Sequence, residues 1–533
     1  MVPTTPDSNT MSFWKPETIR AACLGAWHVR PAQIELPKDR PADLPLPDLF
    51  APIKGLSTDS RTIKPGQAFL ALKGDNFDGH KFVADVARKG APIIIVEDVA
   101  GIPLTGIEDA PGCGVLKVAD TAKALLKIAA AYRDSLKRTR VIAVCGSNGK
   151  TTTTRLIDHL LKAVGMRGTA SAKSFNNSVG VPITILGAKE NDQYLICEVG
   201  TNHPGEIAEL AAVVKPDIAV ITSIGREHLE GLGDLAGVAA EEAAILKKLR
   251  PGGWAITTDA PEFADYVKGI TNLVTFGRSG AATLRLTASN HEIIEGKPTL
   301  VFTVNARQKY RLPLVGEHNA LNAMAALAVA RRLGVQDERA AAALATAGGA
   351  EMRLGIERLG AITVLNDAYN ANPDSMIAGI ETACSLWGAG LGREPAAERR
   401  GTQPQGRCVL ILGEMLEMGP ASAAGHRSVA DAVAERSRTG AIDLVVLVGQ
   451  GMTAARDTLM EKGWTSDRLR WFESADGEHS GAIAALITPG DLVLVKGSRR
   501  VRLERVVEAL RSSFGAKVEI PSRAQPPQPA ART

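Results

Sequence analysis

Residues 141–152 read VIAVCGSNGKTT, an apolar, β-branched run followed by a glycine-rich turn that ends in Lys-Thr-Thr. The run predicts a buried strand, and residues 152–164 predict a helix. A glycine-rich turn between a strand and a helix directs backbone N–H groups and the positive end of the helix dipole at phosphate oxygens. The segment therefore predicts a nucleoside triphosphate site in an α/β domain; the alternative is a chance surface turn.

The residues of this turn suit phosphate and Mg²⁺. Gly146 and Gly149 allow the tight turn, Lys150 adds a mobile positive charge, and the Thr151 hydroxyl suits Mg²⁺. The predicted ATP-binding loop comprises Gly146, Ser147, Asn148, Gly149, Lys150, Thr151 and Thr152. Only two residues separate its glycines, whereas the common P-loop has four, which argues against the GTPases and motor ATPases.

Length and composition indicate a multidomain globular protein. A chain of 533 residues predicts about three domains. The 62 basic and 58 acidic residues nearly balance, so we do not expect a nucleic-acid partner. Six scattered cysteines without a C-x-x-C pair indicate a reducing compartment. There is no apolar leader and no run of about 18 apolar residues, so we expect a cytoplasmic protein without membrane insertion.

Strand-like and helix-like runs alternate in three stretches. The predicted domains are residues 1–137, 138–349 and 350–520, and residues 521–533 are expected to be a disordered tail. Residues 281–313 alternate polar and apolar side chains and look antiparallel, whereas the third stretch has a doubly wound pattern. Residues 388–407 are expected to be a mobile surface insertion, and residues 1–48 remain largely unexplained.

Between Ser57 and Leu510, several motifs occur in the order and spacing of the Mur ligases, which build the peptide of bacterial peptidoglycan with ATP. They are STDSR (57–61), ALKGDNFDGH (71–80), SFNNSVGVPITIL (174–186), EVGTNHPGEI (198–207), GEHNALNA (316–323), NDAYNANPDSM (366–376), LGEMLEMG (412–419) and LVKGSR (494–499). They most resemble the MurF-type ligases, which add D-alanyl-D-alanine to UDP-N-acetylmuramoyl-tripeptide. The resemblance implies a small N-terminal α/β UDP-binding domain, a central P-loop parallel-sheet ATPase domain and a C-terminal doubly wound, Rossmann-like ligase domain.

Two motifs resemble the family's contacts to the UDP-linked substrate. The residues that match the uridine-diphosphate pocket are Ser60, Arg61, Lys73, Gly74, Asp78 and His80. A guanidinium and backbone amides suit a diphosphate, although a polar turn with a surface arginine is the alternative. Asn176 and Asn177 match residues that contact the muramoyl-peptide, and paired amides both donate and accept hydrogen bonds. Elsewhere, an Asn pair is usually only a turn.

Two side chains are candidate Mg²⁺ ligands. Glu198 closes the strand-like run YLICE at its carboxyl end, where open α/β sheets place their ligands. His228 resembles the family's second-metal histidine; the alternative is a structural histidine. Glu227 and Glu230 beside it are predicted to be solvated. With Lys150, Glu198 and His228 form the predicted catalytic set.

One departure from the family pattern concerns a charged metal ligand. Mur ligases generally carry a lysine, carbamylated by CO₂, fourteen residues after the motif histidine, and this chain has Glu242 there. We hypothesise that Glu242, or Glu241 by a one-residue slip, supplies permanently the negative oxygen ligand near the second Mg²⁺. The resemblance then implies a metal set of Thr151, Glu198, His228 and Glu242. The alternative is that both glutamates lie on the exposed face of a helix.

The remaining site residues are inferred from the resemblance alone. Asn319 resembles the asparagine that contacts adenine, and Arg353 and Asp367 resemble residues that reach the γ-phosphate and the ribose when the C-terminal domain closes. Tyr369, Asn370 and Asn372 match the region expected near the incoming dipeptide, with an Asn-Pro turn as the alternative. Lys496 is either a phosphate or carboxylate contact or a strand-end charge.

The implied chemistry is ligation through an acyl phosphate and a tetrahedral intermediate, with ATP and Mg²⁺. The expected substrates are UDP-N-acetylmuramoyl-tripeptide, whose third residue the sequence does not specify, and D-alanyl-D-alanine, and we expect a monomer. One rival is another amide ligase, either a MurE-type enzyme or a folylpolyglutamate synthase. MurE-type enzymes carry Asp-Asn-Pro-Arg where this chain has NANPDS. A second rival is an ATP-binding protein without turnover; the complete loop, Glu198 and His228 argue against it.

Overall fold

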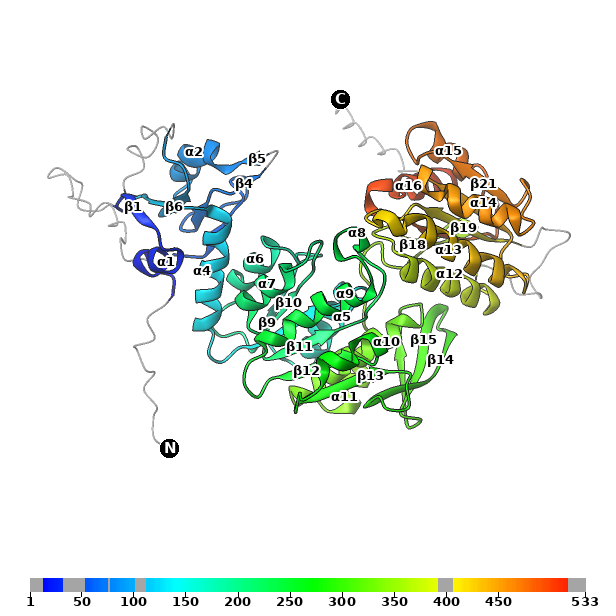
Figure 1. Cartoon of the computed structure of the whole chain (residues 1–533), viewed down its shortest axis with the longest axis horizontal. Coiled ribbons are helices and arrows are strands. Elements are labelled where there is room, and N and C mark those ends of the chain that lie inside the picture. Colours follow the sequence, from blue (N-terminus) through cyan, green and yellow to red (C-terminus); the bar gives the residue numbers. More distant parts are fainter. Residues whose placement is uncertain (1–12, 32–52, 75–76, 101–111, 392–405, 516–533) are drawn as a thin grey trace, which may run out of the picture. The chain divides into compact units, whose positions relative to one another are not determined.

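The structure, a computed structural model, describes residues 13–31, 53–74, 77–100, 112–391 and 406–515 (Figure 1). The chain divides into two compact units. The first contains residues 1–290, 301–313 and 318–348, and the second contains residues 291–300, 314–317 and 349–533. The predicted tail and most of the predicted insertion lie outside the described residues, as does much of the segment 1–48. Within that segment, residues 13–31 include helix α1 (Pro16–Cys23) and strand β1 (Ala26–Val29).

The first unit begins with a five-stranded sheet in the order β1-β7-β6-β3-β2. Its other strands are β2 (Leu56–Ser57), β3 (Ala68–Leu70), β6 (Ile93–Val96) and β7 (Gly114–Lys117). They pair in parallel, and β1 joins β7 antiparallel. A separate hairpin pairs β4 (Lys73–Gly74) with β5 (Phe77–Asp78). The 3-10 helix η1 (Gly79–Phe82), α2 (Val83–Arg88) and α4 (Thr121–Ser135) complete this part.

Helix α4 connects this small sheet to the larger sheet that follows it in the chain (Figure 1). Tyr132 packs against Phe13 and Trp14 on one side, and its hydroxyl donates to the Ala188 carbonyl at 2.6 Å. Arg133 is fully buried and donates to the carbonyls of Val214 and Lys215 and to Asp217, at 2.8, 2.8 and 3.0 Å. Helix α4 therefore shares its core with both sheets.

We expect Arg133→Met to lower the free energy of unfolding of the first unit by about 3–5 kcal/mol, because it removes the cation that pairs with the partly buried Asp217 carboxylate and the donor to two carbonyls. Urea unfolding measures this. The matched control is Arg140→Met, whose guanidinium is exposed and 4.0 Å from the same Asp217; a surface pair of this kind is worth less than about 1 kcal/mol. Equal losses in the two variants would contradict the role of the buried contacts.

The central sheet has nine strands in the order β16-β15-β14-β13-β12-β11-β8-β10-β9. Its strands are β8 (Arg140–Cys145), β9 (Gly168–Ala170), β10 (Tyr194–Glu198), β11 (Ile218–Ile221), β12 (Trp254–Thr258), β13 (Leu273–Gly277), β14 (Leu284–Ile294), β15 (Lys297–Val304) and β16 (Gln308–Leu312). Strands β8 to β13 pair in parallel, and β8, β10 and β11 are buried apart from Arg140. The apolar run 141–145 thus lies at the centre of a parallel sheet, as predicted.

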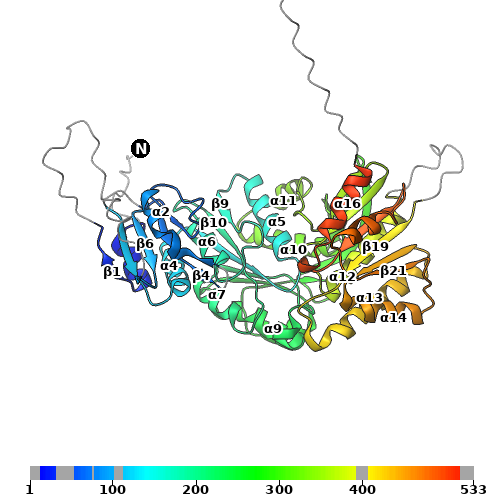
Figure 2. The same ribbon diagram turned by 90° about the horizontal axis from the view of Figure 1, so that it is seen from above.

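Helices cover this sheet. They are α5 (Lys150–Ala163), α6 (Gly180–Leu186), α7 (Glu206–Val214), α8 (Leu229–Leu232), α9 (Leu235–Ala243), α10 (His318–Arg332) and α11 (Asp337–Leu344). The alanine-rich α10 is buried along most of its length and packs beside α5 (Figure 2). Small side chains permit this close approach. Helix α10 therefore brings Asn319 and Asn322 next to the first turn of α5.

The second unit contains a six-stranded sheet in the order β17-β18-β22-β19-β20-β21. Its strands are β17 (Gly355–Leu359), β18 (Ile362–Asp367), β19 (Cys408–Gly413), β20 (Leu444–Val448), β21 (Leu469–Phe472) and β22 (Leu492–Lys496). All pairs except β17–β18 are parallel. The helices are α12 (Pro373–Gly388), α13 (Ser422–Ser437), α14 (Thr453–Glu461), α15 (Glu478–Ala484) and α16 (Glu504–Phe514). The predicted α/β class, with a doubly wound C-terminal part, is confirmed.

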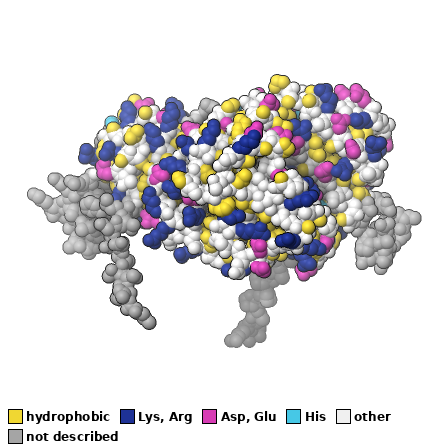
Figure 3. All heavy atoms as spheres, turned by 60° about the horizontal axis from the view of Figure 1, so that its bottom comes forward, with side chains coloured by type: hydrophobic (Ala, Val, Ile, Leu, Met, Phe, Trp, Pro, Cys, Tyr) yellow, Lys and Arg dark blue, Asp and Glu magenta, His cyan; other side chains and the backbone are white. Residues whose placement is uncertain are grey.

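The surface carries both charges. The face seen in Figure 3 intersperses basic and acidic side chains, as the near balance of 62 and 58 charged residues leads one to expect. Within the described ranges, no helix has the length and apolar character that crossing a membrane requires.

A buried histidine makes the second unit sensitive to acid. The Nε2 atom of His426 accepts from the Met415 N–H at 3.0 Å, and its Nδ1 lies 2.8 Å from the Ser422 carbonyl, so the neutral ring fits. Burial lowers the pKa of His426. The unfolded chain therefore binds more protons as pH falls below about 6.5. We expect stability to fall in that direction by up to about 1.4 kcal/mol per pH unit, and His426→Gln to show a smaller slope in unfolding measured from pH 7 to 5. Equal slopes would contradict this.

Candidate active site

The glycine-rich turn connects β8 to α5, which begins at Lys150, two residues earlier than predicted. Gly146 and Gly149 have φ angles of +115° and +88°, which L side chains rarely adopt. A Cβ on Gly146 would lie 2.4 Å from Thr222 Oγ1, and one on Gly149 would lie 2.1 Å from Asn322 Oδ1. Both glycines are therefore required by conformation and by close packing.

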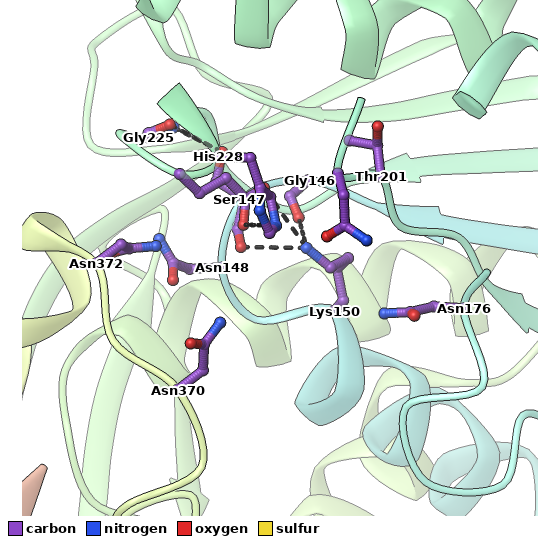
Figure 4. Close-up of polar contacts among 12 residues, drawn as sticks. Gly146, Ser147, Asn148, Lys150, Asn176, Thr201, Gly225, His228, Asn370 and Asn372 are labelled. Atoms are coloured by element: carbon purple, nitrogen blue, oxygen red, sulfur yellow. Dashed lines mark hydrogen bonds and ion pairs between the residues drawn. The ribbon is translucent and has the colours of Figure 1, made fainter. Parts of the chain in front are cut away.

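The loop is held in shape from the end of the neighbouring strand β11. The Thr222 hydroxyl donates to the Asn148 carbonyl at 2.6 Å, and the Asn148 N–H donates to Ser223 Oγ at 2.8 Å. The Ser147 hydroxyl accepts from the Gly225 N–H at 2.8 Å (Figure 4). Thr222 and Ser223 are loop-supporting residues that the sequence motifs did not predict. The available signal was a Thr-Ser pair directly after a buried strand, at the carboxyl edge of the sheet where β8 also ends.

The Lys150 side chain lies over this loop (Figure 4). Its Nζ donates to the carbonyls of Gly146 and Ser147 at 2.6 and 3.2 Å, and lies 3.6 Å from Glu227 Oε1. The ammonium is mostly buried, so its field is screened less than that of a surface lysine. A strong positive charge thus stands at the turn where phosphates are expected.

The prediction that Glu227 is solvated is wrong. Its side chain is 7% exposed and lies between Lys150 and His228, whose Nε2 is 3.9 Å from Glu227 Oε2. Burial raises the pKa of Glu227 to about 7, against the opposing attraction of Lys150. His228, the next residue, has a left-handed φ of +49° at the start of α8. Glu230, by contrast, is exposed as predicted.

Glu242 and Glu241 are both buried, so the interpretation of this pair as an exposed helix face is wrong. Glu242 is fully buried on α9, and its Oε2 accepts from the Gly146 N–H at 2.7 Å. Its Oε1 has no hydrogen-bond partner among the residues that the structure describes. Glu241 instead accepts from the N–H groups of Gly205 and Ile207, both at 2.8 Å, at the start of α7. Glu242 therefore contacts the phosphate loop, whereas Glu241 caps a helix.

The other candidate Mg²⁺ ligands lie around the carboxyl edge of the sheet. Glu198 ends β10 and accepts from Asn176 Nδ2 at 3.0 Å, and Thr151 Oγ1 lies 3.3 Å from Ser174 Oγ. Hydroxyl and carboxylate oxygens suit Mg²⁺, which takes few protein ligands beside phosphates and water. In the described parts of the chain, no three or more His, Cys, Asp or Glu residues gather closely enough to hold a metal ion. The donor set fits Mg²⁺ only together with a phosphate.

Two asparagines have local structural tasks. Asn177 Oδ1 accepts from the N–H groups of Val179 and Gly180 at the start of α6, so this side chain fixes a turn. Asn319 is buried, and its Oδ1 accepts from Asn322 Nδ2 at 3.0 Å. Asn322 Oδ1 in turn lies 3.3 Å from the Thr153 hydroxyl. The Asn319 end of α10 is thereby tied to the first turn of α5.

The predicted diphosphate residues lie near the small N-terminal sheet. Ser60 is buried and its carbonyl accepts from Lys89 Nζ at 2.8 Å, while the Arg61 guanidinium is exposed and pairs with Asp59 at 2.8 Å. Lys73 and Gly74 pair with Asp78 and Phe77 in the β4–β5 hairpin. Asp78 Oδ1 accepts from the His80 N–H at 3.0 Å and lies 2.8 Å from His80 Nδ1. Arg61 thus presents an exposed, paired cation near this sheet.

In the second unit, Arg353, Asp367 and Tyr369 come together. The Arg353 guanidinium lies 4.2 Å from the centroid of the Tyr369 ring, and Asp367 forms an ion pair of 2.7 Å with Lys496. Asn370 is exposed, and its carbonyl accepts from Lys496 Nζ at 3.1 Å. Asn372 caps α12, because its Oδ1 accepts from the Ser375 N–H at 2.8 Å.

The chain is similar to known proteins along most of its length. The model described as the Mur ligase family catalytic domain matches residues 52–133, the Mur ligase middle domain matches residues 144–330, and the Mur ligase glutamate ligase domain matches residues 352–499. The UDP-N-acetylmuramoyl-tripeptide--D-alanyl-D-alanine ligase of Bacillus subtilis is 32% identical over 465 residues, which are 86% of this chain and 94% of that protein. The ligase of the same name from Escherichia coli is 31% identical over 474 residues, again 86% and 94%.

Solved structures agree. The crystal structure of MurF from Acinetobacter baumannii superposes with a TM-score of 0.75 at 29% identity, covering 94% of this chain and 99% of that one. MurF from Thermotoga maritima, solved in complex with ADP, gives a TM-score of 0.70 at 26% identity, covering 88% and 99%. Identity above 30% across nearly the whole length of a relative, together with this fold, shows common descent, and the chain is therefore a member of the Mur ligase family.

Proposed function

We propose that this protein is the ATP-dependent ligase that joins D-alanyl-D-alanine to UDP-N-acetylmuramoyl-tripeptide in peptidoglycan precursor synthesis. The observation that carries the proposal is the glycine-rich loop with Lys150 at a sheet edge, in a chain that covers 94% of relatives named for this reaction. The tripeptide carboxylate takes the γ-phosphoryl group of ATP to form an acyl phosphate and ADP. The dipeptide amine then attacks the acyl carbon through a tetrahedral intermediate and releases phosphate. We place the enzyme in the cytoplasm, because its UDP-linked substrate and ATP are found there, and we propose that it acts as a monomer.

The loop amides and Lys150 bind the β- and γ-phosphates, and Lys150 offsets the charge that grows on the transferring phosphoryl group. We assign adenine to Asn319, the γ-phosphate to Arg353 and the ribose to Asp367. Asn176 and Asn177 contact the muramoyl-peptide, while Tyr369, Asn370 and Asn372 form the turn beside the dipeptide. Ser60, Arg61 and the β4–β5 hairpin with His80 hold the uridine diphosphate.

Thr151, Glu198 and His228 would hold Mg²⁺, which neutralises phosphate charge when bound. Asn176 orients Glu198 through its amide, and the Glu227 carboxyl group lies between Lys150 Nζ at 3.6 Å and His228 Nε2 at 3.9 Å. Glu242 supplies a permanent negative charge where related ligases carry a carbamylated lysine. Its carboxylate accepts a hydrogen bond from the first amide of the phosphate loop. Because a glutamate does not need CO₂ to become an anion, activity should be independent of bicarbonate.

Phosphate release tests the function. Purified protein is given ATP, Mg²⁺ and UDP-N-acetylmuramoyl-tripeptide, with and without D-alanyl-D-alanine, and the product is identified by mass spectrometry. We expect release that requires the dipeptide and a pentapeptide product, with the diaminopimelate and lysine tripeptides compared in parallel. Release only with a dipeptide precursor and a single amino acid would assign the protein to the third-residue ligases. No release with any acceptor would reject ligation altogether.

A further inference from the structure

The second unit contains a buried lysine that the proposed chemistry does not use. Lys496 ends β22 with 3% of its side chain exposed, and it lies directly opposite Asp367 of β18 in the parallel register. Its Nζ donates to Asp367 Oδ2 at 2.7 Å and to the Asn370 carbonyl at 3.1 Å. A buried ammonium with this geometry is a paired internal charge, and it does not present itself to a ligand.

Helix α12 packs closely over the Lys496 side chain. Gly379 of α12 lies over the aliphatic stem, and a Cβ there would be 3.0 Å from Lys496 Cδ. The glycine lets the helix approach the sheet while the stem runs beneath it. The position of the ammonium is therefore fixed by the helix above, the strand beside it and two acceptors.

Asp367 connects Lys496 to the segment before β17 by a hydrogen bond. Its Oδ1 accepts from the Leu354 N–H at 3.2 Å. Leu354 and Met352 have φ angles of +51° and +56°, so two non-glycine residues in the left-handed region bracket Arg353. The guanidinium between them rests on the ring of Tyr369, two residues after Asp367. A strained backbone of this kind persists only where neighbouring contacts hold it.

We propose that Lys496 is a positioning residue that, through Asp367 and the Asn370 carbonyl, sets the backbone that presents Arg353 to the nucleotide. The proposal rests on the proposed function, in which Arg353 contacts the γ-phosphate. In this proposal Lys496 has no direct contact with a substrate. It acts on ATP through Asp367, Leu354 and Arg353, and it also fixes the turn that carries Tyr369.

Nucleotide affinity tests this role without relying on turnover. The affinity of Lys496→Met for a non-hydrolysable ATP analogue is measured by calorimetry, at a temperature where the variant is folded. We expect it to be at least about tenfold weaker than that of the wild type, because displacing the Arg353 guanidinium removes a charge-assisted contact to phosphate, which is among the strong polar contacts. Lys496→Arg should also bind the analogue more weakly than the wild type, because a planar guanidinium is larger than the ammonium that lies beneath Gly379.

Two controls separate positioning from general loss of stability. Arg407→Met removes the partner of Asp491, another buried carboxylate of the same unit, whose ion pair of 2.7 Å does not involve the Arg353 segment. It should lower the melting temperature and leave nucleotide affinity within twofold. In an Arg353→Ala background, Lys496→Met should weaken affinity by a smaller factor than it does in the wild type, because only its effect on Asp367 then remains.

The outcomes are distinct. An unchanged affinity in Lys496→Met, an equal loss in Arg407→Met, or a full additional loss in the Arg353→Ala background would each overturn the positioning role. Wild-type protein that binds the analogue but releases no phosphate with any acceptor would instead reject the proposed function. The two failures are therefore read from different measurements.

Discussion

Lys150→Met should lower kcat by about 10²–10³-fold, the range found when one preorganised charge donor is removed from a transition state. Lys150 is the cation at the phosphate loop, held within 3.2 Å of two loop carbonyls and 3.6 Å from Glu227. When the γ-phosphoryl group transfers, charge develops on its oxygens, and no water can replace a buried ammonium there without reorganisation. Dipeptide-dependent phosphate release at saturating ATP measures the loss.

The matched control lies on the same helix. Lys162→Met removes an exposed lysine of α5 that pairs with Asp158 at 2.7 Å, and it should leave kcat within twofold. The Lys150→Met variant also leaves Glu227 buried without its ammonium. Adding Glu227→Gln should therefore recover melting temperature but not activity. A Lys150→Met enzyme with more than a tenth of the wild-type kcat would contradict the assigned role.

Glu242→Ala should lower kcat by at least about tenfold. The substitution removes a fully buried carboxylate and leaves the Gly146 N–H without its acceptor, which costs about 1–3 kcal/mol at the loop that binds phosphate. The wild-type enzyme should show equal activity in bicarbonate-free and bicarbonate-supplemented buffer, because a glutamate needs no CO₂ to be anionic. The measurement is phosphate release in degassed buffer with increasing bicarbonate.

The reverse substitution is the sharper test. Glu242→Lys installs the residue that related ligases carbamylate, so its low activity should rise with bicarbonate while the wild type stays constant. Glu230→Ala, on the exposed surface two residues after His228, should behave as the wild type. Glu241→Gln should lower melting temperature through the start of α7 and acquire no bicarbonate dependence. Full activity in Glu242→Ala, or stimulation of the wild type by bicarbonate, would refute the hypothesis.

The phosphate loop could be predicted because its determinants are local. One short stretch of chain holds a buried strand, two glycines at positive φ and the start of a helix. The local sequence pattern is therefore enough to predict the loop. The sheet class followed from the apolar runs for the same reason. The family motifs then assigned the order of the domains.

Burial of charged residues could not be predicted in this way. Glu227 lies between an arginine and a histidine, in a stretch that is polar by composition. Its side chain is nevertheless buried, 3.6 Å from the Lys150 ammonium and just before the left-handed turn at His228. The sequence left a ligand contact and a strand-end charge both open for Lys496, because its partner Asp367 is 129 residues away in the chain. The cap at Asn372 was open to both interpretations, because Asn before Pro suits a helix start as well as a turn beside a ligand.

The buried tie at Arg133 has a consequence for recombining this enzyme with its relatives. A chimera joined in the linker after α4 would take the guanidinium from one parent and its acceptors at residues 214, 215 and 217 from the other. Such a hybrid keeps these contacts only if both parents have the arginine and its acceptors at the matching positions. Crossover points that take α4 and residues 214–217 from the same parent preserve the contact. A chimera library with such crossover points should contain more folded proteins than a library whose crossover points separate these two segments.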